Sequence, residues 1–199
     1  MSGHEYLIRE YPLQQGALEI AYIEEYFNEF PKRKTASEIL ERLDGREFQI
    51  LMAEAPVDDG TTVVPVSYKV SHELREEEAD EKLKDLVERL RDTIEFSGRR
   101  ILYNWLGATR RDRRGQGHFR ALTEHQEEWA VAQGYDEVVV KTKNRYYDMR
   151  GTLDSLRFDV VKLEPAPELL ESKVYLSKRL GPSVLDAHRS RRSVTRASK

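Results

Sequence analysis

The chain has 199 residues and no cysteine, which excludes a disulfide framework, a thiolate zinc site and a cysteine nucleophile. Hydrophobic residues make up 39% of it, and ten tyrosines, six phenylalanines and two tryptophans supply core material, so its 35% of charged residues does not indicate disorder. The formal net charge of −3 excludes a general binder of polyanions. The N-terminus lacks a secretory signal and no apolar run approaches the ~18 residues that span a bilayer, so we expect a soluble, cytoplasmic protein without membrane contact.

The first fifty residues predict one strand and two helices. Residues 6–11 have the composition of a short strand, and residues 17–30 carry apolar side chains at roughly helical spacing. Thr35 and Glu38 have the spacing of a capping box, in which each side chain accepts a hydrogen bond from the other residue's backbone N–H. The helix that they open is expected to end before Gly45, which supplies a left-handed residue after the last turn.

A hairpin and an amphipathic helix follow. Residues 48–53 and 62–70 are predicted strands on either side of an Asp-Asp-Gly turn. Residues 75–96 predict a helix inserted between the third and fourth strands, with an apolar stripe made of Leu83, Leu86, Val87, Leu90 and Ile94. This stripe is expected to be buried either against the protein's own sheet edge or against a second copy, which leaves a monomer or a homodimer. We favour the protein's own sheet, because the acidic run 76–78 would repel itself across a two-fold axis.

The second half of the chain alternates strands and helices. In chain order we expect a strand at 101–109, a helix at 116–133, a strand at 136–141, a connecting helix, and strands at 158–163 and 173–177. This order predicts an α/β (α+β) fold for residues 1–180, in which helices flank one mixed, largely antiparallel sheet.

From residue 181 onward the chain has five basic residues, one acid and few large apolar residues. Such a composition predicts a flexible basic tail over 181–199. An unstructured terminus is the interpretation we favour over a weak arm for nucleic acid or an acidic partner.

The motif that carries chemistry follows the predicted strand 101–109. Between Arg99 and Arg120 there are seven arginines and one acid, and Gly115 and Gly117 come just before a predicted helix. Backbone N–H groups at such a helix start form a cradle for phosphate, and arginines can hold further phosphate charge. The glycine spacing matches neither the ATP-binding GxxxxGK[ST] pattern nor the dinucleotide-binding GxGxxG pattern.

The segment Arg114-Gly-Gln-Gly-His-Phe119 resembles the Arg/Gln-x-x-Gly-x-Gly/Ala signature of the GNAT superfamily of acetyl-CoA-dependent acyltransferases, with phenylalanine at the final position. The segment Lys141-Thr-Lys-Asn144 is similar to the strand-to-asparagine step of this family. Leu156-Arg-Phe158 is similar to its Leu-Gly-Phe, with arginine in place of glycine. The resemblance covers residues 5–180 and implies the acyl-CoA N-acyltransferase (GNAT) fold.

The resemblance also implies acetyl-CoA as the cosubstrate, with its pantetheine arm in the gap between the splayed strands 101–109 and 136–141. The acceptor, a small primary amine or a peptide, would attack the thioester directly, and a backbone N–H near residues 106–108 would stabilise the oxyanion. The residues implied to hold the cofactor are Gly107, Ala108, Thr109, Arg114, Gly115, Gln116, Gly117, His118, Phe119, Arg120 and Asn144.

Proton transfer has no obvious residue. Many family members place a tyrosine that protonates the leaving thiolate at the position of Leu153, which has no proton to donate. Tyr147 and its neighbour Tyr146 are possible substitutes, although packing is the interpretation we favour for them. Tyr103 and His72 are candidates for the group that takes a proton from the amine.

Two other functions stay open beside the acyltransferase. The leucine at position 153 and the phenylalanine at 119 are compatible with a non-catalytic CoA sensor or scaffold. The arginine cluster is compatible with a nucleic-acid binder, which we do not favour. The five histidines lack the spacing of a chelating set, since His118 and His125 are seven residues apart, so no metal site is expected.

Overall fold

The computed structural model describes residues 6–14, 17–25, 34–56, 60 and 62–197, and side chains at the end of the last helix only as far as residue 191. Its contacts divide the chain into two compact units. The first unit consists of Met1–His72 and Trp105–Leu122, and the second of Glu73–Asn104 and Thr123–Lys199.

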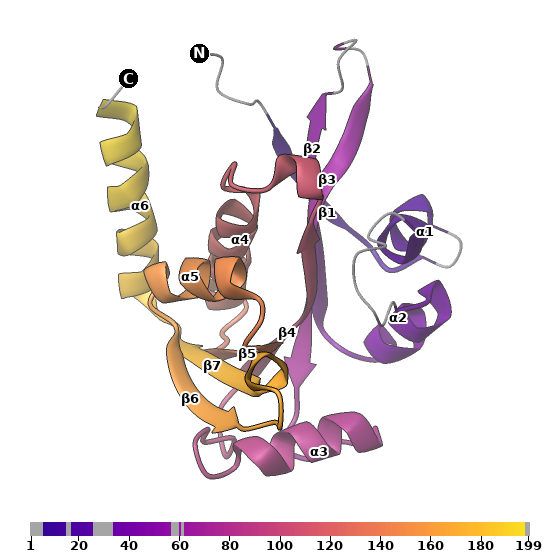
Figure 1. Ribbon diagram of the computed structural model, residues 1–199, viewed down its shortest axis with the longest axis vertical. Coiled ribbons are helices and arrows are strands. Elements are labelled where there is room, and N and C mark those ends of the chain that lie inside the picture. The colour runs from indigo at the N-terminus through magenta and orange to yellow at the C-terminus, as the bar shows by residue number, and fades with distance from the viewer. Residues whose placement is uncertain (1–5, 15–16, 26–33, 57–59, 61, 198–199) are drawn as a thin grey trace. The chain divides into compact units, whose positions relative to one another are not determined.

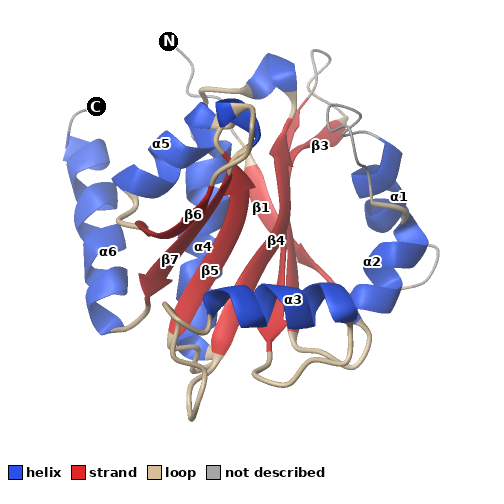
Figure 2. Cartoon of the chain, turned by 60° about the horizontal axis from the view of Figure 1, so that its bottom comes forward, coloured by secondary structure: helices blue, strands red, loops and turns tan. Residues whose placement is uncertain are grey.

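The strands form one mixed sheet in the order β1-β2-β3-β4-β5-β7-β6 (Figure 2). The pairs β1–β2, β2–β3, β5–β7 and β6–β7 are antiparallel, and β4 and β5 are parallel. This confirms the predicted mixed, largely antiparallel sheet. The strands are β1 (Leu7–Tyr11), β2 (Phe48–Pro56), β3 (Val63–Leu74), β4 (Ile101–Thr109), β5 (Glu137–Lys143), β6 (Asp159–Glu164) and β7 (Lys173–Arg179).

The first five helices follow the predicted order, and the sixth was not predicted (Figure 1). They are α1 (Leu18–Glu25), α2 (Ala36–Leu43), α3 (Glu81–Leu90), α4 (His118–Ala132), α5 (Tyr147–Ser155) and α6 (Pro182–Ala197). The remainder of the predicted helix 17–30, and the centre of the hairpin turn, lie outside the described residues. Within the part of the chain that is described, no helix has both the length and the apolar content needed to cross a bilayer.

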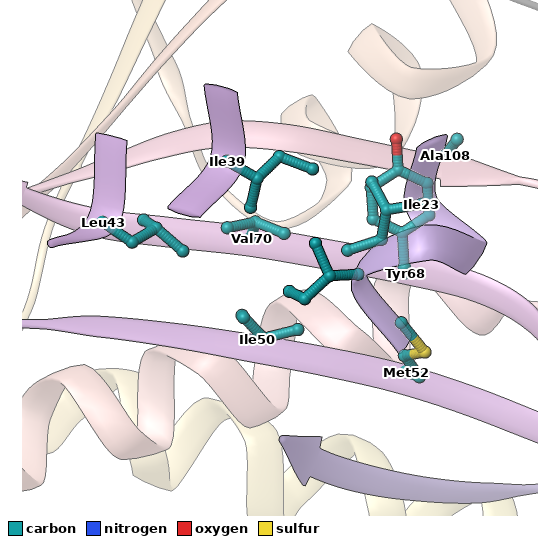
Figure 3. Close-up of a cluster of buried hydrophobic side chains, with 9 residues drawn as sticks. Ile23, Ile39, Leu43, Ile50, Met52, Tyr68, Val70 and Ala108 are labelled. Carbon is teal, nitrogen blue, oxygen red and sulfur yellow. The ribbon is translucent and has the colours of Figure 1, made fainter. Parts of the chain in front are cut away.

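In the first unit, α1 and α2 pack on one face of the sheet. The capping box starts α2 as predicted, because Thr35 Oγ1 accepts from Glu38 N at 3.1 Å and the Glu38 carboxylate accepts from Thr35 N at 2.9 Å. Gly45, with φ +64°, follows the helix. The side chains buried between these helices and the strands are Ile20, Ile23, Ile39, Leu43, Ile50, Met52, Tyr68, Val70 and Ala108 (Figure 3).

In the second unit, α3 buries its apolar stripe within the same chain. Leu83, Leu86, Val87 and Leu90 are all buried, as is Ile94 beyond the helix end. Two polar contacts tie the helix to β6: Arg89 Nη1 pairs with Glu164 Oε1 at 2.7 Å, and Lys162 Nζ donates to the Arg89 carbonyl at 2.6 Å. The protein's own sheet therefore covers the stripe, as we favoured.

The helix itself is shorter than the predicted 75–96. Asp80 caps its start, because Asp80 Oδ1 accepts from Leu83 N at 2.9 Å, and the N–H of Arg75 is used by the Glu78 carboxylate in a separate turn. The side-chain caps of these two acidic residues replace the first turns that periodicity alone predicts.

The segment 181–199, predicted as a flexible tail, is helix α6 over Pro182–Ala197 instead. Val184 and His188 are buried, and His188 Nε2 lies 2.8 Å from Glu127 Oε2 on α4. Lys178 on β7 donates to the same carboxylate oxygen at 2.6 Å. Polar groups rather than large apolar residues anchor this helix, which is why composition did not predict it.

Candidate functional site

The end of β4 is held in place by β3 in the first unit. Ser67 Oγ donates to the Ala108 carbonyl at 2.9 Å and lies 2.8 Å from Thr109 Oγ1. The N–H of Arg110 donates to the Val66 carbonyl at 2.9 Å. The first four residues of β4, Ile101–Asn104, pair with residues 137–140 of the parallel strand β5. The rest of the strand, residues 105–109, contains Gly107, Ala108 and Thr109, which the resemblance assigns to the thioester arm.

The ring of Phe119 packs where Gly107 has no side chain. A Cβ built on Gly107 would lie 3.4 Å from the Tyr68 carbonyl oxygen and 3.6 Å from Phe119 Cε2. The Lys69 ammonium lies 4.5 Å from the centroid of the Phe119 ring, although Lys69 itself is fully buried. The ring of Phe119 therefore fills space above β4 and accepts a cation–π contact, and this gives a packing reason for a large residue where the motif usually has glycine or alanine.

The loop between β4 and α4 has the geometry of an anion site. Gly115 and Gly117 have φ values of +75° and +85°, which glycine adopts without strain. A Cβ at either position would meet no atom within 4 Å, so the space beside the loop is open. The Gly117 carbonyl accepts from Ala121 N at 3.0 Å, which makes Gly117 the residue that precedes the first helical turn.

The backbone donors of this loop are available to a ligand. In the described structure, the N–H groups of Gly115, Gln116 and Gly117 donate to no other group of the chain. The positive end of the α4 dipole lies next to them. Three successive N–H groups together with a helix start make a concave donor surface for an oxyanion.

Arginines surround these donors. Arg110 forms a bidentate pair with Asp112 at 3.0 and 3.1 Å, and Arg114 Nε donates to the Thr109 carbonyl at 3.3 Å. Arg111 is exposed on the short 3₁₀ turn Arg111–Arg113, and Arg120 follows in the first turn of α4. With five arginines and one aspartate between residues 110 and 120, the loop has a strongly positive local charge.

Gln116 and His118 have unequal roles in this geometry. His118 is buried, contacts Tyr6 edge-on with ring centroids 4.5 Å apart, and lies 3.1 Å from Gln116 Oε1 through Nε2. The imidazole thus packs beneath the loop and orients the Gln116 side chain.

Asn144 follows β5 in the second unit. Its side chain donates from Nδ2 to the Leu169 carbonyl at 3.2 Å, and its Oδ1 accepts from the Arg150 guanidinium. Both ends of the amide are therefore used by the second unit itself. Its backbone N–H donates to the Ser172 carbonyl at 2.9 Å.

The proposed proton-transfer residues lie in different surroundings. Tyr103 is buried on β4, whereas Tyr147 is 58% exposed at the first position of α5. Leu153 is completely buried, so the position of the family's tyrosine is part of the core here. His72 is buried at the end of the first unit, with its ring 5.7 Å from that of Trp105.

The sequence did not single out Ser67, Lys69 or the pair of Tyr11 and Glu54. Burial and the neighbouring Glu54 carboxylate raise the pKa of Tyr11 to about 12, and Tyr11 donates to that carboxylate while Arg9 Nε lies 2.9 Å from it.

Within the described residues, no three His, Asp or Glu side chains are grouped in a way that could hold a metal ion.

Comparisons of the chain with protein-family models and with curated protein sequences find no match. Solved structures do match. Arabidopsis thaliana NAA60 with a bisubstrate analogue has a TM-score of 0.65 at 12% identity, over 88% of this chain and 99% of that one. The same enzyme with acetyl-CoA has a TM-score of 0.64 at 11% identity, over 87% and 98%. The ribosomal-protein-S18-alanine N-acetyltransferase of Escherichia coli has a TM-score of 0.58 at 13% identity, over 88% and 95%.

The chain therefore has the fold of the GNAT acetyltransferases. The match extends over almost the entire length of those proteins, and it confirms the fold that the motif in residues 114–119 implied.

Proposed function

We propose that this protein is an acetyl-CoA-dependent N-acetyltransferase that acetylates the primary amine of a small molecule or a peptide. The observation that carries the proposal is the loop 115–117, where three successive backbone N–H groups have no partner in the described chain and arginines precede and follow them in the sequence. A pyrophosphate group is the part of coenzyme A that such a donor surface fits. Proteins with the same fold have been crystallised with acetyl-CoA and with a bisubstrate analogue.

In this proposal, different residues of the first unit bind different parts of the cofactor. Gly115–Arg120 bind the pyrophosphate, with Arg114 on the rim of the loop. Gly107, Ala108 and Thr109 offer backbone groups to the pantetheine amides, and Ser67 keeps this segment extended through the Ala108 carbonyl. The assignment of Asn144, in the second unit, to the cofactor stays a prediction that rests on the resemblance alone.

The chemistry is a direct transfer. When bound, acetyl-CoA supplies an activated thioester carbonyl. The backbone N–H groups at the end of β4 stabilise the oxyanion that forms when the neutral amine attacks. Tyr103 is the proposed group that removes a proton from the amine, directly or through water. The thiolate is a good leaving group because the pKa of a thiol is near 8.5, so the transfer does not require a strong acid, and Tyr147 is the candidate for a proton donor.

A CoA-binding sensor is the second candidate, and Leu153 is the observation that favours it. An aliphatic side chain in the core cannot take over the acid role that a tyrosine has at this position in many family members.

The test combines binding with turnover. We expect acetyl-CoA to raise the melting temperature of the wild type, since a ligand that binds the native state stabilises it. Gly117→Val should abolish this shift, because a β-branched residue at φ +85° distorts the loop. Gly98→Val is the matched control: Gly98 also has a positive φ and open space around it, yet lies in the second unit before β4.

If both variants respond to acetyl-CoA like the wild type, the phosphate assignment is wrong. Release of free thiol with a panel of amines and peptides would establish the transferase. Stabilisation by CoA without thiol release from any acceptor would instead support the sensor. Affinity for DNA or RNA that falls steeply with salt, without any effect of CoA, would support the nucleic-acid binder.

A further inference from the structure

A cavity of about 580 Å³ lies in the second unit, and none of its lining residues is among those assigned to the cofactor. It is formed by the loop between α5 and β6, the start of β5 at Glu137, the end of β7 and the first turns of α6. Asn144 follows the other end of β5, and seven residues of strand at ~3.3 Å each separate the two ends by about 20 Å. A volume of this size is in the ordinary range for a small-molecule site.

One wall of the cavity contains Arg157, whose backbone is strained. Its φ of +66° is the only positive value of any non-glycine residue in the described chain. The N–H of Arg157 donates to the Asp154 carbonyl at 2.9 Å, so this residue terminates α5 in a position that glycine usually takes. An arginine here is disfavoured by its own backbone, and strain of this kind is found at functional sites.

The cations around the cavity fall into two groups. Arg99 pairs with Glu137 at 3.0 Å, Lys178 with Glu127 at 2.6 Å, and Arg191 with Glu124 at 3.0 Å. The side chains of Arg157 and Arg179, by contrast, form no ion pair or hydrogen bond with another described residue. These two guanidinium groups are therefore available to an anion.

The floor of the cavity supplies a hydroxyl. Ser177 on β7 is 6% exposed, lines the cavity, and has no side-chain hydrogen bond to the described part of the chain. The hydroxyl of Ser177 can therefore donate a hydrogen bond to a ligand in the cavity or accept one from it. Asp159 and Glu95, two further lining residues without ion pairs to described residues, can accept hydrogen bonds from donors on the same ligand.

We propose that this cavity binds a small phosphate monoester, with Arg157, Arg179 and Ser177 on the phosphate oxygens. A phosphate offers three strong acceptor oxygens, and guanidinium groups bind them in a bidentate manner. Asp159 and Glu95 accept hydrogen bonds from hydroxyl groups of the organic part. The site shares no residue with those assigned to acetyl-CoA, and it does not depend on the proposed acetyltransferase activity.

Titration of the ¹⁵N-labelled full-length protein with sn-glycerol 3-phosphate, inorganic phosphate and glycerol tests the proposal by nuclear magnetic resonance. We expect saturable shifts of the Ser177, Arg179 and Arg157 amides with the phosphate ester and none with glycerol. Equal affinity for inorganic phosphate would identify the free ion as the ligand, and weaker affinity would identify an organic phosphate. Shifts confined to the loop 114–120, or no saturable shift at the cavity amides, would overturn the proposal. Because each amide reports its own site, failure here is distinguishable from failure of cofactor binding.

Arg157→Gly separates binding from folding. Glycine relieves the strained backbone, so the melting temperature should rise by about 2–8 °C. Loss of a charged hydrogen-bond donor should weaken phosphate-ester binding by tenfold or more. Arg157→Asn, which also tolerates a left-handed backbone, should lose affinity in the same way and serves if the glycine variant does not fold. Arg189→Gln removes one exposed arginine from α6 and should leave affinity unchanged. Wild-type affinity in Arg157→Gly and Arg157→Asn would refute the role of Arg157.

Discussion

Replacing Leu86 with alanine tests whether the second unit is built on the apolar face of α3. Leu86 is 3% exposed, so the substitution removes buried methyl groups and leaves a cavity. Such changes cost about 2–5 kcal/mol, a large part of the ~5–15 kcal/mol that stabilises an ordinary domain. For a chain of this length, each kcal/mol lowers the melting temperature by about 2–4 °C, so we expect a fall of about 4–20 °C.

Glu88→Ala is the matched control on the same helix. The Glu88 side chain is 60% exposed and pairs with Arg91 at 2.9 Å on the surface of the helix, so its loss should change the unfolding free energy by less than about 0.5 kcal/mol. Urea unfolding followed by circular dichroism measures both variants. Sedimentation velocity on the wild type and on Leu86→Glu/Leu90→Glu completes the test. A wild-type dimer that the double substitution converts into folded monomers would refute burial of the stripe within one chain.

Three further predictions concern single side chains. Two hydrogen bonds, one from the Thr35 backbone N–H with the larger effect and one from the Lys34 ammonium with the smaller, lower the pKa of Glu38 from 4.5 to about 2. Its charge therefore stabilises the fold above pH 4.5, and the advantage of wild type over Glu38→Gln in urea unfolding should disappear as the pH falls towards 2. Tyr146→Phe and Tyr147→Phe should each lower turnover by less than about tenfold, and a larger fall with CoA affinity intact would identify a working acid. Gly107→Val should destabilise the fold by about 1–3 kcal/mol, because the added methyl groups overpack the ring of Phe119. Thermal unfolding measures this loss, and an unchanged melting temperature would contradict the packing.

Elements with local signals could be predicted from the sequence. The capping box of Thr35 and Glu38 and the left-handed Gly45 bracket α2 within eleven residues. The hairpin of β2 and β3 follows from its turn composition, and β4 from an apolar run of strand length. In each case the signal and the structure that it determines lie within one stretch of chain.

The candidate site could be predicted only as far as its glycines. Gly115 and Gly117 mark a loop with unusual backbone angles, and the structure shows that both have positive φ. The environment of Phe119 was not predictable, since it depends on Lys69, fifty residues earlier, and on the absence of a side chain at Gly107. Because β3 is buried on both faces along most of its length, Lys69 breaks the expected pattern of apolar residues and gives no alternating signal.

Residues 156–158 resemble Leu-Gly-Phe except at Arg157, and the structure shows what this exception means for the backbone. The family's glycine corresponds to a backbone that only glycine adopts easily, and the structure retains this backbone with φ +66° at Arg157. The turn at this position therefore has the backbone that glycine favours, although the residue is arginine. A substitution that costs stability without a packing gain is the kind of departure from local rules that indicates a functional residue.

Helix α6 provides the last prediction, because composition and structure disagree about it. His188 is fully buried against Glu127, whereas its neighbour Arg189 has 72% of its side chain exposed. His188→Ala removes a buried ring and one partner of a buried carboxylate, and should cost about 2–4 kcal/mol of unfolding free energy. Arg189→Ala should cost less than about 0.5 kcal/mol. In a flexible tail both substitutions would be neutral. If both variants have the unfolding free energy of the wild type in urea, residues 181–199 are a flexible tail and α6 is not packed on the domain. A large loss for His188→Ala alone would show that a carboxylate on α4, 61 residues earlier in the chain, anchors this helix.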